Sequence, residues 1–535
     1  MTTLHSLATG AIRSGRTEPA VFVDVKSAYD TVPHAAVVAR LRQLGVSKPL
    51  VQWVLRFLQD RCFRTTFRGV ASEWMRTTRG LPQGSVLAPL LFIIWFDVIV
   101  PRLERCGVLP QLVADDLLLV VKSSAAVEVK LQQLEMALYA LTQWAQGQHV
   151  KFQLKKSGVI FFRRKGAPLP DDDQRAMLTL QGQQVFTVSQ YKYLGVMFDE
   201  HLTFASHLAT VRSKISSMCS RLRLITSAYG ACYPSPKLAV ALIKSLVLPS
   251  AAWGCAIWGI ANQSALHHLD VQHAFLLSLP LGVAGVAAHE AVLAEVGVMP
   301  MRTVFAQAVL SLASHFALNP SLVSSRIVAD GYGPPEFVAD PVYDRRLFAE
   351  QLFITRSELK LEVEAPVHPD GMASLPVPEA QSVIKQRLAE AALALWVARR
   401  DPVIHEYLPQ GRGPHVYLQV DSLESRVARS CLRFKRLRTN AWKAQAGLQD
   451  DSLCSWPACA AAGISDDCHH VLFSCPRFRS VRNESIARLT LLQLPHTPLS
   501  FLGHIPAGLS RTKAREFLLA ARSFLGSVYS VYCVR

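Results

Sequence analysis

The sequence predicts an α/β domain in the N-terminal part of the chain, followed by a mainly helical region. PAVFVDV at 19–25 is an apolar, β-branched run that suits a buried strand. Apolar residues at helical spacing follow in 33–44, which Gly45 closes, and again in about 47–59. From 205 to 315 the pattern is mostly helical. With 535 residues, half of them hydrophobic, the chain has room for about two to four domains.

The remaining N-terminal elements follow in order. Residues 62–78 predict two strands around Gly69. VLAPLLFIIWFDVIVPRL at 86–103 predicts a buried helix, and 124–146 a long amphipathic one. Between these helices, residues 109–122 form two apolar runs that meet at a pair of aspartates, which is the pattern of a hairpin.

Charge and apolar content narrow the class of partner. The 57 Lys and Arg exceed the 40 Asp and Glu by 17, and the pI is near 9.5, so a polyanion such as nucleic acid is favoured. No secretory leader is visible. The longest apolar run, 86–100, is too short to cross a bilayer and contains Asp97, so no membrane partner is expected. The mostly scattered cysteines indicate reduced thiols in the cytoplasm or nucleus.

Three aspartates stand at the ends of apolar runs. Asp24 ends one run, and Asp115 and Asp116 lie between two others. Burying carboxylates there is costly without a cation. If the strands are neighbours in one sheet, Asp24 and Asp115 meet at one edge and can bridge two divalent ions. The alternative for the Asp–Asp pair taken alone is a polar turn.

Four motifs carry a resemblance. They are FVDVKSAYDTVPH (22–34), GLPQGSVLAPLLF (80–92), VADDLLLV (113–120) and YKYLGVMFDEHLTFASH (191–207). In this order and near this spacing, they resemble the catalytic blocks of non-LTR (LINE, jockey-like) reverse transcriptases. The resemblance covers roughly residues 5–315 and 425–480. A group II intron maturase fits less well, because the YLGV motif and a Cys/His cluster near the C-terminus point to mobile-element polymerases.

The resemblance implies a right-hand polymerase with an α/β palm, that is, an antiparallel sheet with helices, and partial fingers. A mostly helical thumb and a small zinc knuckle would follow. The implied activity is RNA-directed DNA polymerisation, with an RNA template, a DNA primer or target DNA and dNTPs as partners. Mg²⁺ (or Mn²⁺) would be held by Asp24 and Asp115, with Asp116 as the third carboxylate.

The resemblance also implies roles for residues around the carboxylates. Tyr29 would lie under the incoming sugar and exclude a 2′-hydroxyl, with simple core packing as its alternative. Gln83 and Gly84 would line the nucleotide and template pocket, followed by Ser85 in the same loop. Lys156 would protonate the leaving pyrophosphate, unless it forms only a solvated pair with Lys155.

Two basic segments are expected to contact nucleic acid, each with a solvated basic face as the alternative. The first lies in the implied thumb, where the phosphate contacts would come from Arg212, Lys214, Arg221 and Arg223. The second is 426–443, which holds seven basic residues and no acidic one. Its expected contacts are Arg429, Arg433, Lys435, Arg436 and Arg438.

A Cys/His cluster follows. Cys454-x4-Cys459, ten residues and then His470-x4-Cys475 supply the ligand types of one tetrahedral Zn²⁺. The close of this cluster resembles the H-x-L-F-x-C-P ending of many non-LTR polymerases. Cys468 and His469 are rival ligands, and a degenerate cluster without metal is the alternative.

The predicted organisation has six segments. They are a palm with remnant fingers (1–165), a helical thumb or connection (185–315), a Pro/Gly-rich linker or insertion (316–380), a basic helical segment (381–445), a zinc knuckle (446–480) and a C-terminal tail (481–535).

Two features depart from the family pattern. Val113 stands where an aromatic residue is usual, and only 23 residues precede Asp24, where the family has a longer fingers segment. The expectation is a truncated copy in which an upstream fragment supplies the fingers or an endonuclease. The rival hypothesis is a catalytically inactive remnant that only binds nucleic acid.

Overall fold

The computed structural model divides the chain into two compact units. The first unit is formed by Met1–His207, and the second by Leu208–Leu318 together with the described residues beyond 420. The structure describes residues 1–533 except 124, 229–235, 260–262, 282–288, 319–420, 422, 434–438, 446, 495–500, 504 and 506–508. The predicted linker at 316–380 and most of the predicted segment 381–445 therefore lie outside the described residues.

A four-stranded antiparallel sheet forms the centre of the first unit, with the strand order β6-β7-β1-β8. The strands are β1 (Glu18–Asp24), β6 (Leu109–Val113), β7 (Asp116–Val120) and β8 (Gly158–Phe162). The strand predicted at 19–25 and the hairpin predicted at 109–122 are both confirmed. Nearly every residue of β1 is buried, as a central strand covered on both faces requires.

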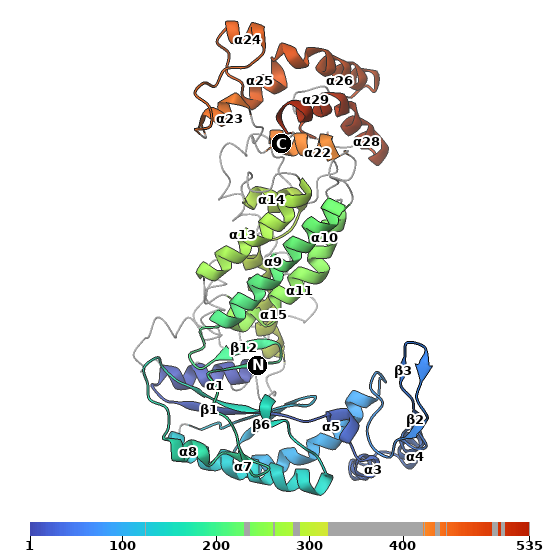
Figure 1. Cartoon of the computed structure of the whole chain (residues 1–535), viewed down its shortest axis with the longest axis vertical. Helices are drawn as coiled ribbons and strands as arrows, with labels where there is room; N and C mark the ends of the chain where they lie inside the picture. Colours follow the sequence, from blue (N-terminus) through green and yellow to red (C-terminus); the bar gives the residue numbers. More distant parts are fainter. Residues whose placement is uncertain are drawn as a thin grey trace. The chain divides into compact units, whose positions relative to one another are not determined.

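Helices cover both faces of this sheet (Figure 1). On one face, Val21, Leu119 and Phe161 join a core with Trp95 of α5 (Ala88–Phe96) and Leu138 of α7 (Val127–Gln148). The other face is covered by α1 (Thr2–Arg13) and by the hairpin of β11 (Gln190–Tyr193) and β12 (Val196–Asp199).

The helix predicted at 86–103 is interrupted. It is divided into α5, the 3₁₀ turn η1 (Asp97–Ile99) and α6 (Val100–Arg105). Pro101 lies in the first turn of α6, where its missing N–H costs nothing and its ring disfavours a continuous helix through it.

The first unit also contains short elements that connect these layers. Between β1 and α5 are α2 (Ala28–Thr31), α3 (His34–Gln43), α4 (Lys48–Leu58), β2 (Cys62–Phe63), β3 (Thr66–Phe67), β4 (Val70–Ala71) and β5 (Met75–Arg76). After α7 come η2 (Leu154–Lys156), α8 (Asp172–Ala176), β9 (Thr179–Leu180) and β10 (Gln183–Gln184). The predicted strands around Gly69 are thus two short ladders of one hairpin, β2 with β5 and β3 with β4.

The second unit is helical in its described residues. Its first part contains most of α9 (Ala205–Ala228), then α10 (Pro236–Leu242), the π turn η3 (Ile243–Val247), α11 (Leu248–Ala252), α12 (Cys255–Trp258), α13 (Gln263–Ser278), η4 (Leu279–Leu281), α14 (His289–Val296) and α15 (Met301–Leu318). Its C-terminal part contains α22 (Leu423–Arg433), α23 (Asn440–Gln445), α24 (Pro457–Ala461), α25 (Cys468–Phe473), η6 (Pro476–Phe478), α26 (Arg479–Leu491), α28 (Arg511–Ala520) and α29 (Arg522–Tyr532). No described helix is long and apolar enough to cross a membrane.

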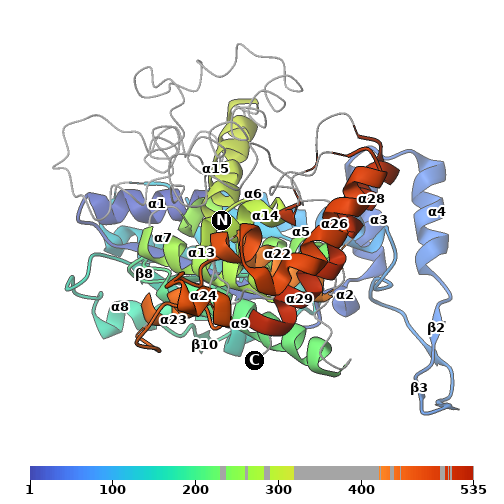
Figure 2. The same cartoon turned by 90° about the horizontal axis from the view of Figure 1, so that it is seen from above.

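Two predicted boundaries differ from the structure. Residues 185–207 were expected to open the helical region but belong to the first unit, because Thr187 bridges to Val159 and Tyr191 stacks on Phe22. The segment 481–535 is not a separate tail, because α29 packs against both α22 and α26 (Figure 2).

Candidate functional site

The predicted carboxylates come together at one end of the central strand pair. Antiparallel register sets Asp24 directly opposite Asp116, and Asp115 lies in the tight turn just before β7. Directly opposed residues have their Cβ atoms about 4.5–5.5 Å apart and point to the same face. Ala114 has φ +54°, which turns the chain sharply between β6 and β7. Three acidic groups therefore lie at the same end of the β1–β7 pair, where the sequence predicted that Asp24 and Asp115 would meet.

The charges in this cluster influence one another. Burial raises the pKa of Asp24, Lys156 lowers it and Asp115 raises it. Burial also raises the pKa of Asp116, and both other aspartates act in the same direction. Asp115 thus disfavours the ionised forms of both Asp24 and Asp116, and a cation at this site would stabilise their negative charge.

The backbone of Asp24 is held from the neighbouring segment 153–157. The Asp24 amide donates to Ser157 Oγ (3.2 Å), and the Gln153 amide donates to the Asp24 carbonyl (2.8 Å). The turn η2 between these residues places Lys156 Nζ 4.0 Å from Asp24 Oδ2. The Lys156 side chain is 64% exposed, so it is both close to the cluster and free to move toward a bound substrate.

The motif 80–92 is joined to the segment just after Asp24. The amides of Gly80 and Leu81 donate to the carbonyls of Val32 and Tyr29. Gly80 has φ +89°, and a Cβ on it would lie 2.9 Å from the Asp30 carbonyl oxygen, so only glycine fits this approach. Gln83 Nε2 donates to Asp30 Oδ1 (3.1 Å), which brings Gln83 near α2.

Tyr29, Gly84 and Ser85 are placed but their predicted roles stay predictions. The half-buried Tyr29 ring stacks on Phe92, with ring centroids 5.1 Å apart, as the core-packing alternative requires. Gly84 has φ +87° and nothing within 4 Å of where a Cβ would lie, so its backbone is open to a ligand. Ser85 Oγ accepts the Ala88 amide and so begins α5. Val113, the position where an aromatic residue is usual, is exposed.

Two tyrosines near the carboxylates were not singled out from the sequence. Tyr191 stacks on Phe22 with ring centroids 4.2 Å apart, and its hydroxyl donates to the Lys156 carbonyl oxygen (2.5 Å). Burial and the charges of Asp116 and Asp24 raise the pKa of Tyr191 to about 12. Burial and Asp116 also raise the pKa of Tyr193. Both tyrosines lie in the motif 191–207, which contributed to the family resemblance but assigned neither of them a role.

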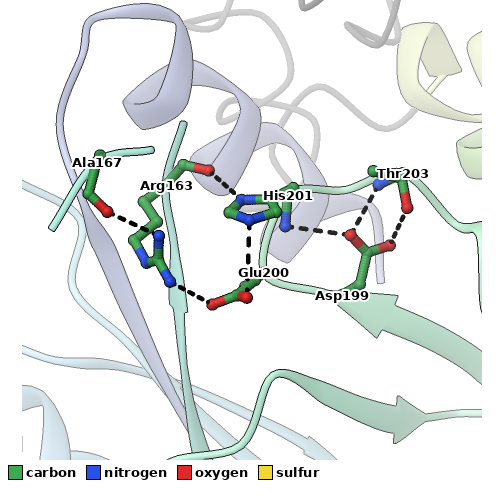
Figure 3. A network of polar contacts seen from close by, with 6 residues as sticks. All are labelled: Arg163, Ala167, Asp199, Glu200, His201 and Thr203. Atoms are coloured by element: carbon green, nitrogen blue, oxygen red, sulfur yellow. Dashed lines mark hydrogen bonds and ion pairs between the residues drawn. The ribbon is translucent and has the colours of Figure 1, made fainter. Parts of the chain in front are cut away.

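The turn after β12 is organised around one carboxylate (Figure 3). Asp199 accepts the amides of His201, Thr203 and Phe204 and the Thr203 hydroxyl, at 2.6–3.1 Å. Beside it, Glu200 pairs with Arg163 (2.8 Å), and His201 Nδ1–H donates to the Arg163 carbonyl (2.9 Å). These contacts fix the start of α9 to the end of β8.

The four predicted zinc ligands meet in the second unit. Cys454, Cys459, His470 and Cys475 are buried, and their ligand atoms all lie within 4.8 Å of one another. The Sγ atoms of Cys454 and Cys475 are 4.0 Å apart. His470 Nδ1 contacts Ser474 Oγ (3.0 Å), while its buried Nε2 has no hydrogen-bond partner and remains for a metal.

The rival ligands are not part of this cluster. His469 is exposed and its ring contacts that of Phe473 in a tilted arrangement, and Cys468 is only half-buried at the start of α25. Burial and the neighbouring Cys454 raise the pKa of Cys459, and burial raises that of Cys475 to about 12. The donor set fits one tetrahedral metal ion of the zinc type.

Two of the predicted nucleic-acid contacts are wrong. Arg429 and Arg433 are fully buried and paired with acids, Arg429 with Asp421 and Arg433 with Glu295, each at 2.7 Å. Arg429 also donates to the carbonyls of Phe501 and Leu518, and Arg433 to that of Leu502. Both guanidinium groups form their ion pairs and hydrogen bonds in the interior of the second unit, so a phosphate cannot reach them.

The other basic contacts stay predictions. Lys214 and Arg221 are exposed and line a groove of about 380 Å³ between α9 and the η3–α11 segment, where Lys214 donates to Ser250 Oγ (3.3 Å). Arg212 is half-buried on α9. The Arg223 side chain and the residues Lys435, Arg436 and Arg438 lie outside the described part of the chain.

Comparison with known proteins identifies the first unit. Residues 2–198 match the family described as "Reverse transcriptase (RNA-dependent DNA polymerase)". The RNA-directed DNA polymerase from mobile element jockey of Drosophila melanogaster is 26% identical over 262 residues, which cover 47% of this chain and 27% of that protein. The probable RNA-directed DNA polymerase from transposon X-element of the same species is 25% identical, with the same two shares.

A third relative comes from another element. The putative 115 kDa protein in type-1 retrotransposable element R1DM of Drosophila melanogaster is 30% identical over 241 residues, 44% of this chain and 22% of that protein. The chain thus spans about a quarter of the length of these curated relatives. The family match reaches residue 198 and so includes nearly all of the β11–β12 hairpin, beyond the boundary at 165 that the sequence predicted. The N-terminal part of this chain is a reverse transcriptase domain of the kind that non-LTR, LINE-type retrotransposons encode.

Proposed function

We propose that the chain catalyses RNA-directed DNA synthesis, with an RNA template, a DNA primer and dNTPs. The observation that carries the proposal is the carboxylate cluster, in which Asp24 and Asp116 are cross-strand partners and Asp115 lies in the adjoining turn. In the reaction, the primer 3′-oxygen bonds to the α-phosphorus of the dNTP. The bond from that phosphorus to the bridging oxygen breaks, and pyrophosphate leaves.

The residues present fit a pair of divalent ions, because three carboxylates at the same end of the strand pair supply hard oxygen donors. Asp24 and Asp115 would hold Mg²⁺ (or Mn²⁺), with Asp116 beside them. When bound, the ions activate the 3′-hydroxyl and stabilise charge on the transferred phosphate.

The other side chains would position and protonate the reactants. Lys156, 4.0 Å from Asp24, would donate a proton to pyrophosphate as it leaves. Gln83, tied to α2, and the open backbone at Gly84 would face the nucleotide. The Tyr29 ring, braced by Phe92, would exclude a ribose 2′-hydroxyl.

We further propose that the cluster of Cys454, Cys459, His470 and Cys475 binds one structural Zn²⁺ in the second unit. Four buried donors and the unpartnered Nε2 of His470 support this assignment. The proposed compartment is a reducing one, the cytoplasm or the nucleus. Cleavage of the target DNA would come from an upstream fragment or a separate polypeptide.

Primer extension tests the proposed activity. The purified chain is incubated with poly(rA)–oligo(dT), labelled dTTP and Mg²⁺ or Mn²⁺, beside the variant Asp115→Ala/Asp116→Ala. We expect extension by the parent and a loss of at least about 10³-fold in the variant, because charge stabilisation dominates phosphoryl transfer.

The same assay decides between the proposed activity and the rival hypothesis of an inactive remnant. If neither protein extends the primer while both bind RNA tightly and with strong salt dependence, the activity is refuted. The chain is then a nucleic-acid-binding remnant. An unchanged thermal melting curve of the variant is the control that its carboxylates were not needed for folding.

A further inference from the structure

The hairpin at 62–76 projects from the first unit, and no described element covers it. Every residue in this range is exposed. The hairpin follows the end of α4 and projects to one side of the unit (Figures 1 and 2). Its two ladders are short, and a hairpin of two strands is only marginally stable on its own. Arg68 and Gly69 both have positive φ, as a two-residue type I′ turn requires.

Large apolar side chains of this hairpin are exposed in the described structure. Phe67 is 71% exposed, Val70 75% and Trp74 63%, and the cross-strand pair Phe63 and Met75 is about half exposed. On the adjoining α4, the exposed Trp53 stacks on Phe57 with ring planes 9° apart. Apolar surface of this kind in one place marks a contact with another molecule.

Arginines alternate with these rings. Arg64 lies 4.9 Å from the centroid of Trp74, Arg68 5.4 Å from that of Phe67, and Arg61 5.6 Å from that of Phe57. These cation–π contacts hold the guanidinium groups next to the aromatic faces while they remain exposed to solvent. In the range 61–76 the acidic residue is Glu73, against four arginines, and Asp60 pairs with the fourth, Arg76.

We propose that this hairpin binds an unpaired nucleic-acid strand, through bases stacked on Phe67 and Trp74 and phosphates held by Arg64 and Arg68. Exposed rings interleaved with cations are what a single strand needs, because its bases present free faces and its backbone repeats negative charge. A duplex offers the phosphates but not the base faces. The charge excess of the hairpin argues against an apolar protein partner. The inference deepens the proposed function, in which the strand would be the RNA template, and rests on it for that identity.

Fluorescence anisotropy with labelled oligo(rA) tests the proposal on the full chain. Phe67→Ala/Trp74→Ala should raise Kd about tenfold or more at every salt concentration, since each lost stack weakens binding several-fold. Arg64→Ala/Arg68→Ala should instead flatten the slope of log K against log salt by about 1.4, two phosphates at about 0.7 each. These residues are exposed, so the variants should melt as the parent does.

A matched control removes an exposed arginine and an exposed ring elsewhere. Arg102 on α6 and Tyr139 on α7 serve, and Arg102→Ala/Tyr139→Ala should bind as the parent does. The proposal is overturned if the hairpin variants keep the parent's affinity, if the parent does not bind oligo(rA), or if the ring variant loses fully paired RNA as much as single strands.

Primer extension run on the same proteins separates this inference from the proposed function. A parent that does not extend primers, with hairpin variants that lose oligo(rA), refutes polymerisation and keeps the hairpin contact. A parent that extends primers, with hairpin variants that bind normally, keeps polymerisation and refutes the hairpin contact.

Discussion

A buried ion pair joins the central strand to the helix beneath it. Lys130 of α7 pairs with Glu18 at the start of β1, and both side chains are almost completely buried. Burial raises the pKa of Glu18 to about 7, although Lys130 acts in the opposite direction. An isolated charge at this place would be costly, so each partner depends on the other.

Replacing Lys130 with Met should therefore destabilise the first unit by about 3–5 kcal/mol, because it leaves a buried carboxyl without a cation. The carboxyl binds its proton more tightly in the folded state than in the unfolded state, so stability falls as pH rises from about 4.5 toward and beyond 7. The loss should be larger at pH 8 than at pH 5. Hydrogen exchange of β1 and α7 measures it.

A double variant provides the control. Glu18→Leu/Lys130→Met should recover most of the lost stability, since an apolar pair of similar volume needs no counter-charge. Exchange protection in Lys130→Met equal to that of the parent at pH 8 would contradict the argument.

At the level of single residues, the sequence allowed the carboxylates to be placed but not the buried arginines. Asp24 ends one apolar strand and Asp116 begins another, and such strands pair in only a few ways. Arg429 and Arg433 stand in an equally clear basic segment, yet their partners, Asp421 and Glu295, lie 8 and 138 residues away. The net charge of a segment does not determine which of its side chains are buried, because burial depends on tertiary contacts with residues far away in the sequence.

At the level of elements, the turn after β12 holds the chain in a costly conformation. Leu202 and Phe204 both have positive φ, which costs about 1–2 kcal/mol for a residue with a side chain. The carboxylate of Asp199 offsets this cost by accepting the amides of His201 and Thr203 (Figure 3) and also that of Phe204.

Asp199→Ala should lower the local stability of 196–207 by about 1–3 kcal/mol, because several amides lose a charged acceptor. Asp199→Asn keeps one acceptor oxygen, so the local stability of this segment should lie between that of the parent and that of Asp199→Ala. Hydrogen exchange of this segment is the measurement. Asp172→Ala, at an exposed carboxylate on α8, is the matched control, and an Asp199→Ala protein no looser than this control would refute the role.

The same elements show where a pattern fails. The strand at 19–25 was predictable because its short apolar run is β-branched, which favours a buried strand. The assignment of 185–207 to the first unit was not, since it depends on Tyr191 stacking on Phe22 across the sheet. The helix predicted at 86–103 breaks at Asp97–Ile99, although apolar residues continue on both sides of Asp97.

At the level of the whole molecule, the C-terminal part of the second unit depends on the Cys/His cluster. Arg482 of α26 donates to the carbonyls of Cys475 and Phe473, and Asp466 accepts the Tyr532 hydroxyl from α29. The helix α29 in turn packs on α22. Loosening the cluster should therefore release a chain of contacts that reaches well beyond its four ligands.

Removing zinc should loosen the second unit and leave the first intact. A zinc-selective chelator in excess Mg²⁺ should raise hydrogen exchange in α25, α26 and α29, because a structural site contributes about 10–16 kcal/mol to folding. Exchange in β1 and β7 should not change, since the first unit encloses its own core. Metal analysis should find one zinc per chain. The Cys459→Ser variant should lose this zinc and Cys468→Ser should keep it, because Cys459 belongs to the four-ligand cluster and Cys468 does not. Equal zinc content in these two variants, or chelation that leaves α26 and α29 protected, would show that the cluster does not hold the fold together.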